Sequence, residues 1–101
     1  MLKINNNATD KEGSFYCIDK ITSLFASSLK EELIKVLSEP NVKFTLNLEN
    51  IKYIDSSGIG VLISALKTAR QNNNFFYLSN VNKDIMNLFC IMKLDKVFDF
   101  A

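Results

Sequence analysis

The residues whose side chains are best suited to chemistry lie in one stretch, Asp55-Ser56-Ser57-Gly58-Ile59-Gly60. An apolar, β-type run (residues 42–54) precedes it, and a run with helical spacing (residues 58–70) follows it. We therefore expect a strand-to-helix junction that carries two hydroxyls. The first N–H groups of a helix have no intrahelical partner, and Asp or Ser oxygens accept hydrogen bonds from them. The stretch is either a well-capped helix start or a serine presented on a rigid corner for binding or modification.

Enzymatic use of these serines is disfavoured by what the chain lacks. It contains no histidine, so a Ser-His-Asp hydrolase cannot be assembled from it, and Lys52 is the one alternative base near the motif. Gly58-Ile59-Gly60 lacks the third glycine of a dinucleotide fingerprint and the lysine of a phosphate-binding loop. We expect a protein that is not an enzyme, with no catalytic residue, no metal site and no cofactor.

The two cysteines, Cys17 and Cys90, are far apart in the sequence, and each lies in an apolar run. Their spacing matches neither a disulfide framework nor a set of metal ligands. We expect both to be small, reduced residues of the core.

Composition limits the class of protein. A chain of 101 residues, 48% hydrophobic and 23% charged, is typical of one globular domain, residues 1–101. The net charge is +1, with twelve basic residues scattered among eleven acidic ones, which argues against a nucleic-acid partner. No apolar run is long enough to span a bilayer, and residues 1–5 lack the apolar core of a signal peptide. We expect a cytoplasmic protein that does not insert into a membrane.

Hydrophobic periodicity predicts the element order β-β-α-β-α-β-α-β. The expected strands cover residues 2–4, 14–21, 42–48, 75–78 and 97–100, and the apolar stripes of the expected helices cover 29–37, 59–69 and 85–92. Strands that alternate with helices after an initial hairpin favour an α/β domain, with a mixed, mostly parallel sheet backed by helices. The 55–60 stretch then falls at the carboxyl end of a strand, where such sheets place their sites.

Local signals set the expected boundaries. The polar residues 5–13 indicate a loop, and residues 22–26 a connection that ends before a capping box, Ser28-Leu29-Lys30-Glu31. Residues 75–78 are expected to be a fully buried strand. Asn80 or Asn82 is expected to cap the third helix. The inward stripe of that helix is expected to be Ile85, Leu88, Phe89 and Met92.

The order of elements and the motif together resemble the STAS domain, the family of bacterial anti-sigma factor antagonists. The likeness extends over nearly the whole chain. It rests on Phe44–Leu48, Ile51–Ile54, Asp55–Leu62, Met86–Phe89 and Leu94–Phe98. A lone D-S-S-G would be weak, but D-S-S-G-x-G between a strand and a helix in a chain of this size is specific for the fold.

The resemblance implies a site and its partners. In members that switch partners, a serine kinase that doubles as the anti-sigma factor phosphorylates the serine directly after the Asp, and a serine phosphatase resets the cycle. Carried over, the acceptor is Ser56, with Ser57 as second choice, and Asp55 orients the hydroxyl or contacts the kinase. The partner surface would comprise residues 55–59 with Leu24 and Phe25, on a protein that works as a monomer.

One stretch departs from the family pattern. Many switching members carry an acidic residue after the second strand, whereas Thr22-Ser23-Leu24-Phe25 has none. Leu24 and Phe25 either enlarge an apolar contact patch beside the motif or are buried under the first helix.

Two functions are consistent with this reading. The first is a regulatory module switched by phosphorylation of Ser56, in which the added charge blocks an interface without unfolding the domain. The alternative is a STAS-type docking subunit of a larger assembly, such as a lipid-transport complex at the inner membrane or a signalling complex, without a phosphorylation cycle.

Overall fold

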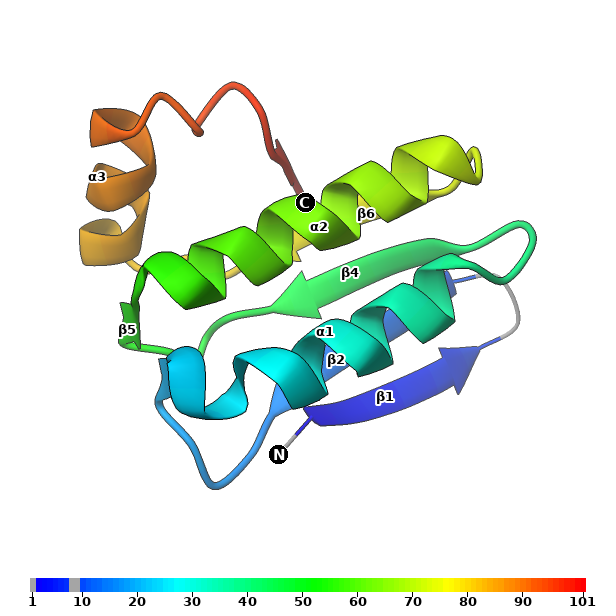
Figure 1. The fold of residues 1–101 in the computed structure, drawn as a ribbon, viewed down its shortest axis with the longest axis horizontal. Helices are drawn as coiled ribbons and strands as arrows, with labels where there is room; N and C mark the ends of the chain where they lie inside the picture. Colours follow the sequence, from blue (N-terminus) through cyan, green and yellow to red (C-terminus); the bar gives the residue numbers. More distant parts are fainter. Residues whose placement is uncertain (1, 8–9) are drawn as a thin grey trace.

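The computed structural model describes residues 2–7 and 10–101, which form one layered α/β arrangement (Figure 1). The chain runs through β1 (Leu2–Asn7), β2 (Asp10–Phe15), β3 (Lys20–Ile21), α1 (Ser23–Leu37), β4 (Lys43–Asn47), β5 (Tyr53–Ile54), α2 (Ser56–Gln71), β6 (Phe75–Ser79), α3 (Lys83–Ile91) and β7 (Asp99–Phe100). Five strands form a sheet in the order β1-β2-β4-β6-β7. The β1–β2 pair is antiparallel and the other pairs are parallel, so the predicted mixed, mostly parallel sheet is confirmed.

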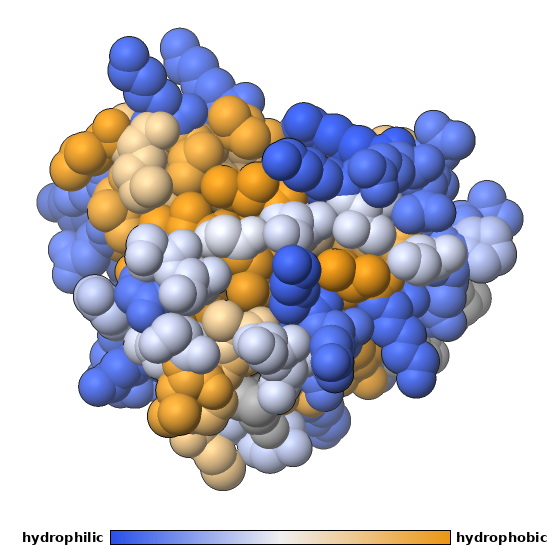
Figure 2. Space-filling model, viewed as in Figure 1, coloured by the Kyte–Doolittle hydropathy of each residue, from blue (hydrophilic) through white to orange (hydrophobic). Residues whose placement is uncertain are grey.

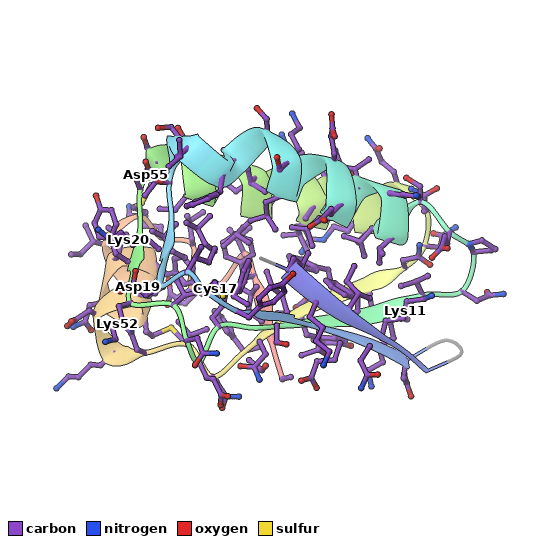
Figure 3. All side chains as sticks on the ribbon, turned by 90° about the horizontal axis from the view of Figure 1, so that it is seen from below. Lys11, Cys17, Asp19, Lys20, Lys52 and Asp55 are labelled. Carbon is purple, nitrogen blue, oxygen red and sulfur yellow. The ribbon has the colours of Figure 1, made fainter. Side chains whose placement is uncertain are left out.

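The core lies between this sheet and the paired helices α1 and α2, which run side by side over one face (Figure 1). Alternate residues of β4 and β6 point into it, and the rings of Phe44 and Phe76 stack with their centroids 6.2 Å apart. The intervening residues point to the opposite face, where Lys43 lies over the ring of Tyr77. Figure 3 shows side chains projecting from this open side of the sheet.

The predicted initial hairpin is antiparallel, as expected, but its strands extend into the stretch 5–13 that was expected to be a loop. The described parts of residues 5–13 belong to β1 and β2, and positions 8 and 9 lie outside the described residues. The polar residues of β1 and β2 are compatible with strands because one face of this sheet is open to solvent. Gly13, which suggested a turn, is buried in β2. A Cβ there would lie 2.6 Å from the ring of Phe44, so glycine makes room for that ring.

The predicted strand 14–21 and the predicted start of the first helix were both wrong. Strand β2 ends at Phe15, and only Lys20–Ile21 is extended again, as β3 in a separate two-stranded sheet with β5. Helix α1 begins at Ser23, so Leu24 and Phe25 are helical and the Ser28–Glu31 pair lies inside the helix. Periodic apolar residues located the middle of this helix but not its first turn.

Three expectations about burial were also wrong. Phe75 is 58% exposed, because β6 has one open face and is not fully buried. Met92 follows the end of α3 and is exposed, whereas Ile85 and Phe89 are buried as predicted. Cys17 and Cys90 are both exposed, and Cys17 has a left-handed backbone with φ of 63°. The last strand is also shorter than expected and begins at Asp99.

A buried amide, Asn74, joins three segments at the end of the sheet remote from the motif. Its Oδ1 accepts from the N–H of Val42 at 2.9 Å, and its Nδ2 donates to the carbonyls of Leu37 and Glu39, both at 2.7 Å. These bonds link the end of α1, the start of β4 and the turn before β6. Within the described part of the chain, no helix has the length and apolar character needed to cross a bilayer.

Candidate functional site

The start of α2 is capped by Asp55, as the motif predicted. The Asp55 backbone is extended, and the N–H of Gly58 donates to Asp55 Oδ1 at 2.9 Å. The second carboxylate oxygen is used as well. Asp55 Oδ2 accepts from the backbone N–H of Ser23, the first residue of α1, at 3.0 Å. One carboxylate therefore serves the starts of two helices, where both helix dipoles place partial positive charge.

A short parallel pair of strands, β3 and β5, holds this corner in place. Ile21 lies opposite Ile54 in the pair, and both are buried. The N–H of Asp55 donates to the carbonyl of Ile21 at 3.1 Å, which extends the pairing up to the cap. Because β3 leads directly into α1 and β5 into α2, the pair brings the two helix starts together. Figure 3 shows Asp55 and Lys20 at one end of the molecule and Lys11 at the other.

Gly58 is required for this close approach. A Cβ at position 58 would lie 2.6 Å from the carbonyl oxygen of Ile21 and 2.7 Å from Ile54 Cγ2. Because a backbone oxygen cannot move away cheaply, any side chain there would force β3 and α2 apart. A Cβ at Gly60 would meet nothing within 4 Å. The two glycines of the motif therefore have different roles, and only the first is demanded by packing.

The structure separates the predicted partner-binding residues into exposed and buried ones. Ser56 and Ser57 are exposed on the first turn of α2, and Leu24, on the first turn of α1, is 81% exposed. Burial of Leu24 under the first helix, one of the two readings left open by the sequence, is therefore wrong. Phe25 is half-buried. Gly58 and Ile59 are buried, so they shape the corner from beneath.

A shallow groove of about 350 Å³ runs between α1 and α2 next to this corner. Ser57 lines it together with small residues and one lysine: Ala26, Ser27, Lys30, Gly60, Val61 and Ser64. The groove is wide enough to admit a side chain of a partner but is too open to enclose a small molecule. The arrangement is suited to contact with a protein surface.

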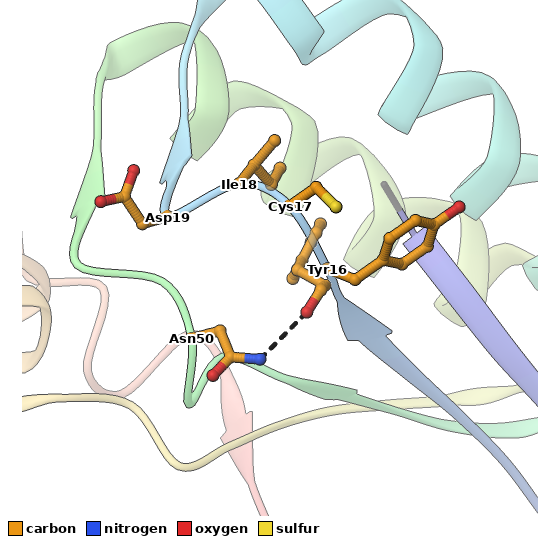
Figure 4. A pocket seen from close by; sticks show the side chains of 6 residues that line it. Tyr16, Cys17, Ile18, Asp19 and Asn50 are labelled. Atoms are coloured by element: carbon orange, nitrogen blue, oxygen red, sulfur yellow. Dashed lines mark hydrogen bonds between the residues drawn. The ribbon is translucent and has the colours of Figure 1, made fainter.

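A second hollow, of about 330 Å³, lies where the chain leaves β2 (Figure 4). Tyr16, Cys17, Ile18 and Asp19 line its rim, and Asn50 Nδ2 closes one side by donating to the carbonyl of Phe15 at 3.0 Å. Among the described residues, no cluster of three or more His, Cys, Asp or Glu side chains could hold a metal ion.

Sequence reasoning missed the bond between Ser23 and Asp55 because it placed the helix start six residues too late. A signal was present: Thr22 and Ser23 are residue types that often begin helices, and they directly precede apolar Leu24 and Phe25. Thr22 occupies the cap position, but its side chain makes no capping bond. The N–H of Ser23 is satisfied by Asp55 instead, which no local pattern reveals.

Comparison with known proteins identifies the family of this chain. The model of the STAS domain family matches residues 3–101, so the chain belongs to the STAS domain family. An anti-sigma-B factor antagonist of Staphylococcus epidermidis is 35% identical over 66 residues, which cover 65% of this chain. The match spans 61% of that relative's length.

Solved structures show the same fold. An anti-sigma-factor antagonist (STAS) domain protein from Planctomyces limnophilus superposes with a TM-score of 0.88, at 16% identity, over 98% of this chain and 87% of that one. The phosphorylated form of the Bacillus cell fate determinant SpoIIAA has a TM-score of 0.74, at 13% identity, over 100% of this chain and 91% of that one. At these identities the likeness concerns the fold alone.

Proposed function

We propose that this protein is an anti-sigma factor antagonist that exchanges partners through reversible phosphorylation of Ser56. The unphosphorylated form binds an anti-sigma factor that is also a serine kinase, and a serine phosphatase restores that form. The proposal places the protein in the cytoplasm as a monomer between exchanges. It is supported by the name of the Staphylococcus epidermidis relative and by the solved phosphorylated form of SpoIIAA.

The observation that carries the proposal is the position of Ser56. It is the first residue of α2, its side chain is exposed, and it directly follows the residue that caps two helices. Both oxygens of Asp55 are engaged by backbone N–H groups, so the cap does not use the Ser56 hydroxyl. A phosphoryl group can therefore be added to Ser56 without breaking the bonds that hold the corner together.

Electrostatics explains how such a group would act. A phosphate adds about −1.5 to −2 charges and three acceptor oxygens. The first turn of α2 has no acidic residue, and the helix N-terminus favours negative charge by up to ~1 kcal/mol. The modified domain therefore stays folded, while a partner that buried the neutral corner now has to desolvate a phosphate. Binding is lost because the interface is blocked.

The exposed residues define the surface that the partner covers. Leu24 lies on the first turn of α1, which the Ser23–Asp55 bond fixes beside Ser56 and Ser57. A partner that covers the two serines also buries Leu24, so this leucine supplies apolar area to the interface. Phe25 supports it from a half-buried position.

The test is phosphopeptide mapping of the protein isolated from its own cells, grown in at least two conditions. Fragment ions distinguish Ser56 from its neighbour Ser57, which serves as the internal control. We expect phosphate on Ser56 in an amount that changes with condition. Ser56 that stays unmodified in every condition, or phosphate on Ser57 alone, would overturn the assignment.

A further inference from the structure

A second exposed surface lies at the end of α3 and on the segment after it. Ile91 is 79% exposed, Met92 44% and Val97 37%. In Figure 2 the apolar area over α3 and beside α2, at the upper left, is bordered by hydrophilic surface. Ile91 and Met92 are consecutive, and Val97 follows five residues later. Contiguous exposed apolar area indicates a contact surface. We call these three residues with their basic neighbours, defined below, the α3 surface.

The backbone beneath this surface is well ordered by hydrogen bonds. Helix α3 ends with bonds from the N–H of Lys93 to the carbonyl of Cys90 at 3.1 Å and from Leu94 to Phe89 at 2.7 Å. The ring of Phe98, buried just after the segment, packs on Phe89 with centroids 5.3 Å apart. The exposed side chains are thus presented on a fixed frame, which lowers the entropic cost of binding.

Val97, at one side of the α3 surface, lies near the end of α2 that is far from Ser56. Arg70, in the last turn of α2, donates from Nη2 to the carbonyl of Val97 at 3.2 Å. Ser56 and Arg70 stand at opposite ends of a helix that rises 1.5 Å per residue, so they are about 20 Å apart. A partner could therefore occupy the α3 surface around Val97 whether or not Ser56 is modified.

Charge is distributed unevenly around these apolar residues. Residues 56–71 and 85–98 together contain four basic residues and one acidic residue, Asp95. Their net charge is +3, whereas the whole chain carries +1, so the remaining residues carry −2. The four basic residues are Lys67, Arg70, Lys93 and Lys96.

We propose that the α3 surface docks an acidic amphipathic helix of a protein partner. Arg70 of α2 bonds to Val97, and the exposed Lys93 and Lys96 lie in the segment that also carries Met92 and Val97. Exposed apolar residues accompanied by basic ones match a helix whose leucine stripe is flanked by glutamates. A bilayer is the poorer fit, because three partly exposed side chains bury too little apolar area for stable anchoring. This docking is separate from the Ser56 switch.

The probe is a synthetic helical peptide of about 18 residues, or five turns, with leucines at i, i+3, i+4 and i+7 spacing and glutamates between them. A second peptide replaces every glutamate with lysine. Titration into labelled protein, followed by NMR, is expected to shift the signals of Ile91 and Val97 with the acidic peptide only. Ile91→Ser and the double variant Lys93→Glu/Lys96→Glu are each expected to weaken binding about tenfold or more.

Matched controls make the test specific. Leu24→Ser removes an equally exposed apolar side chain from the first turn of α1, and Lys35→Glu reverses an exposed lysine of α1. Both are expected to leave the Kd unchanged, and so is Ser56→Asp, which separates this proposal from the phosphorylation switch. Equal binding of the two peptides, equal losses in the Leu24 and Ile91 variants, or absence of shifts at Ile91 and Val97 would overturn the proposal. Sedimentation with phosphatidylglycerol vesicles in place of peptide binding would overturn it as well.

Discussion

The carboxylate of Asp55 accepts a hydrogen bond at 3.0 Å from the backbone N–H of Ser23, a residue 32 positions earlier in the chain. The same carboxylate caps its own helix through Gly58. This pair of bonds makes the corner a single unit, in which the exposed Leu24 and Ser56 keep a constant relation to each other. Because one side chain bonds to two helix starts, substituting it is expected to lower the free energy of unfolding more than the loss of a single cap would.

Asp55→Ala is expected to lower the free energy of unfolding by roughly 2–3 kcal/mol, because two helices each lose a cap contribution of about 1 kcal/mol. Asp55→Asn is expected to cost about half as much, since the amide oxygen still accepts from Gly58 but the NH₂ group cannot accept from Ser23. Urea denaturation followed by circular dichroism measures both. An Asn variant as stable as the wild type would show that the Ser23 bond contributes nothing.

The glycines of the motif are expected to respond oppositely to alanine. Gly58→Ala places a Cβ against the Ile21 carbonyl and is expected to destabilise the domain by roughly 1–3 kcal/mol. Gly60→Ala enters open space within a helix and is expected to stabilise it by about 0.5–1 kcal/mol, because the unfolded chain loses freedom. Thermal melting compares the pair directly. A neutral Gly58→Ala variant would contradict the packing derived for the corner.

Ser56→Asp is expected to keep the melting temperature within about 3 °C of the wild type, which corresponds to less than 1 kcal/mol, because a negative charge suits the first turn of α2. The same variant is expected to lose binding to the anti-sigma factor of its own organism, measured by calorimetry with purified proteins. Ser56→Ala serves as the control and should bind. Loss of binding through collapse of the fold would contradict an interface-blocking switch.

Asn74→Asp is expected to make the domain less stable as pH rises. The introduced carboxyl would face the carbonyls of Leu37 and Glu39, and burial together with these oxygens would raise its folded-state pKa. A raised folded-state pKa means that the folded chain holds the proton more tightly than the unfolded chain. The stabilisation is full below an unfolded pKa of about 3.9 and is lost as pH rises through the folded value. The variant should therefore melt lower at pH 7 than at pH 4.5, relative to wild type.

The matching variant Asn74→Ala has no titratable group and is expected to cost roughly 3 kcal/mol at both pH values, since it leaves a buried N–H and two carbonyls without their partner. Denaturation of both variants at the two pH values isolates the effect of the introduced carboxyl. A pH-independent loss in Asn74→Asp would indicate that water reaches the site.

Hydrophobic periodicity predicted an element correctly where the buried residues recur at the regular spacing of that element. The alternation of β4 and the stripe of α2 follow from residue spacing. Residue type indicated the cap Asp55 and left Asn80 or Asn82 for the third helix, and the structure shows that Asn82 is the cap. The predicted bounds were wrong for strands that are stabilised by pairing with other strands. Strand β2 is polar because its outer face is solvated. Strand β3 has only two residues, which pair with the two residues of β5, and so short a strand has no recognisable sequence period.

By itself, the sequence determined the α/β class, the order of the main elements, the STAS family and the serine corner at the start of α2. All of these depend on residue types and spacings within single elements, and both can be read directly from the linear sequence. Only the tertiary structure decided that Asp55 also holds Ser23, that Leu24 is exposed, and that Arg70 of α2 donates to the carbonyl of Val97. Those relations join positions distant in sequence, and they depend on how helices and strands pack, which no local period encodes.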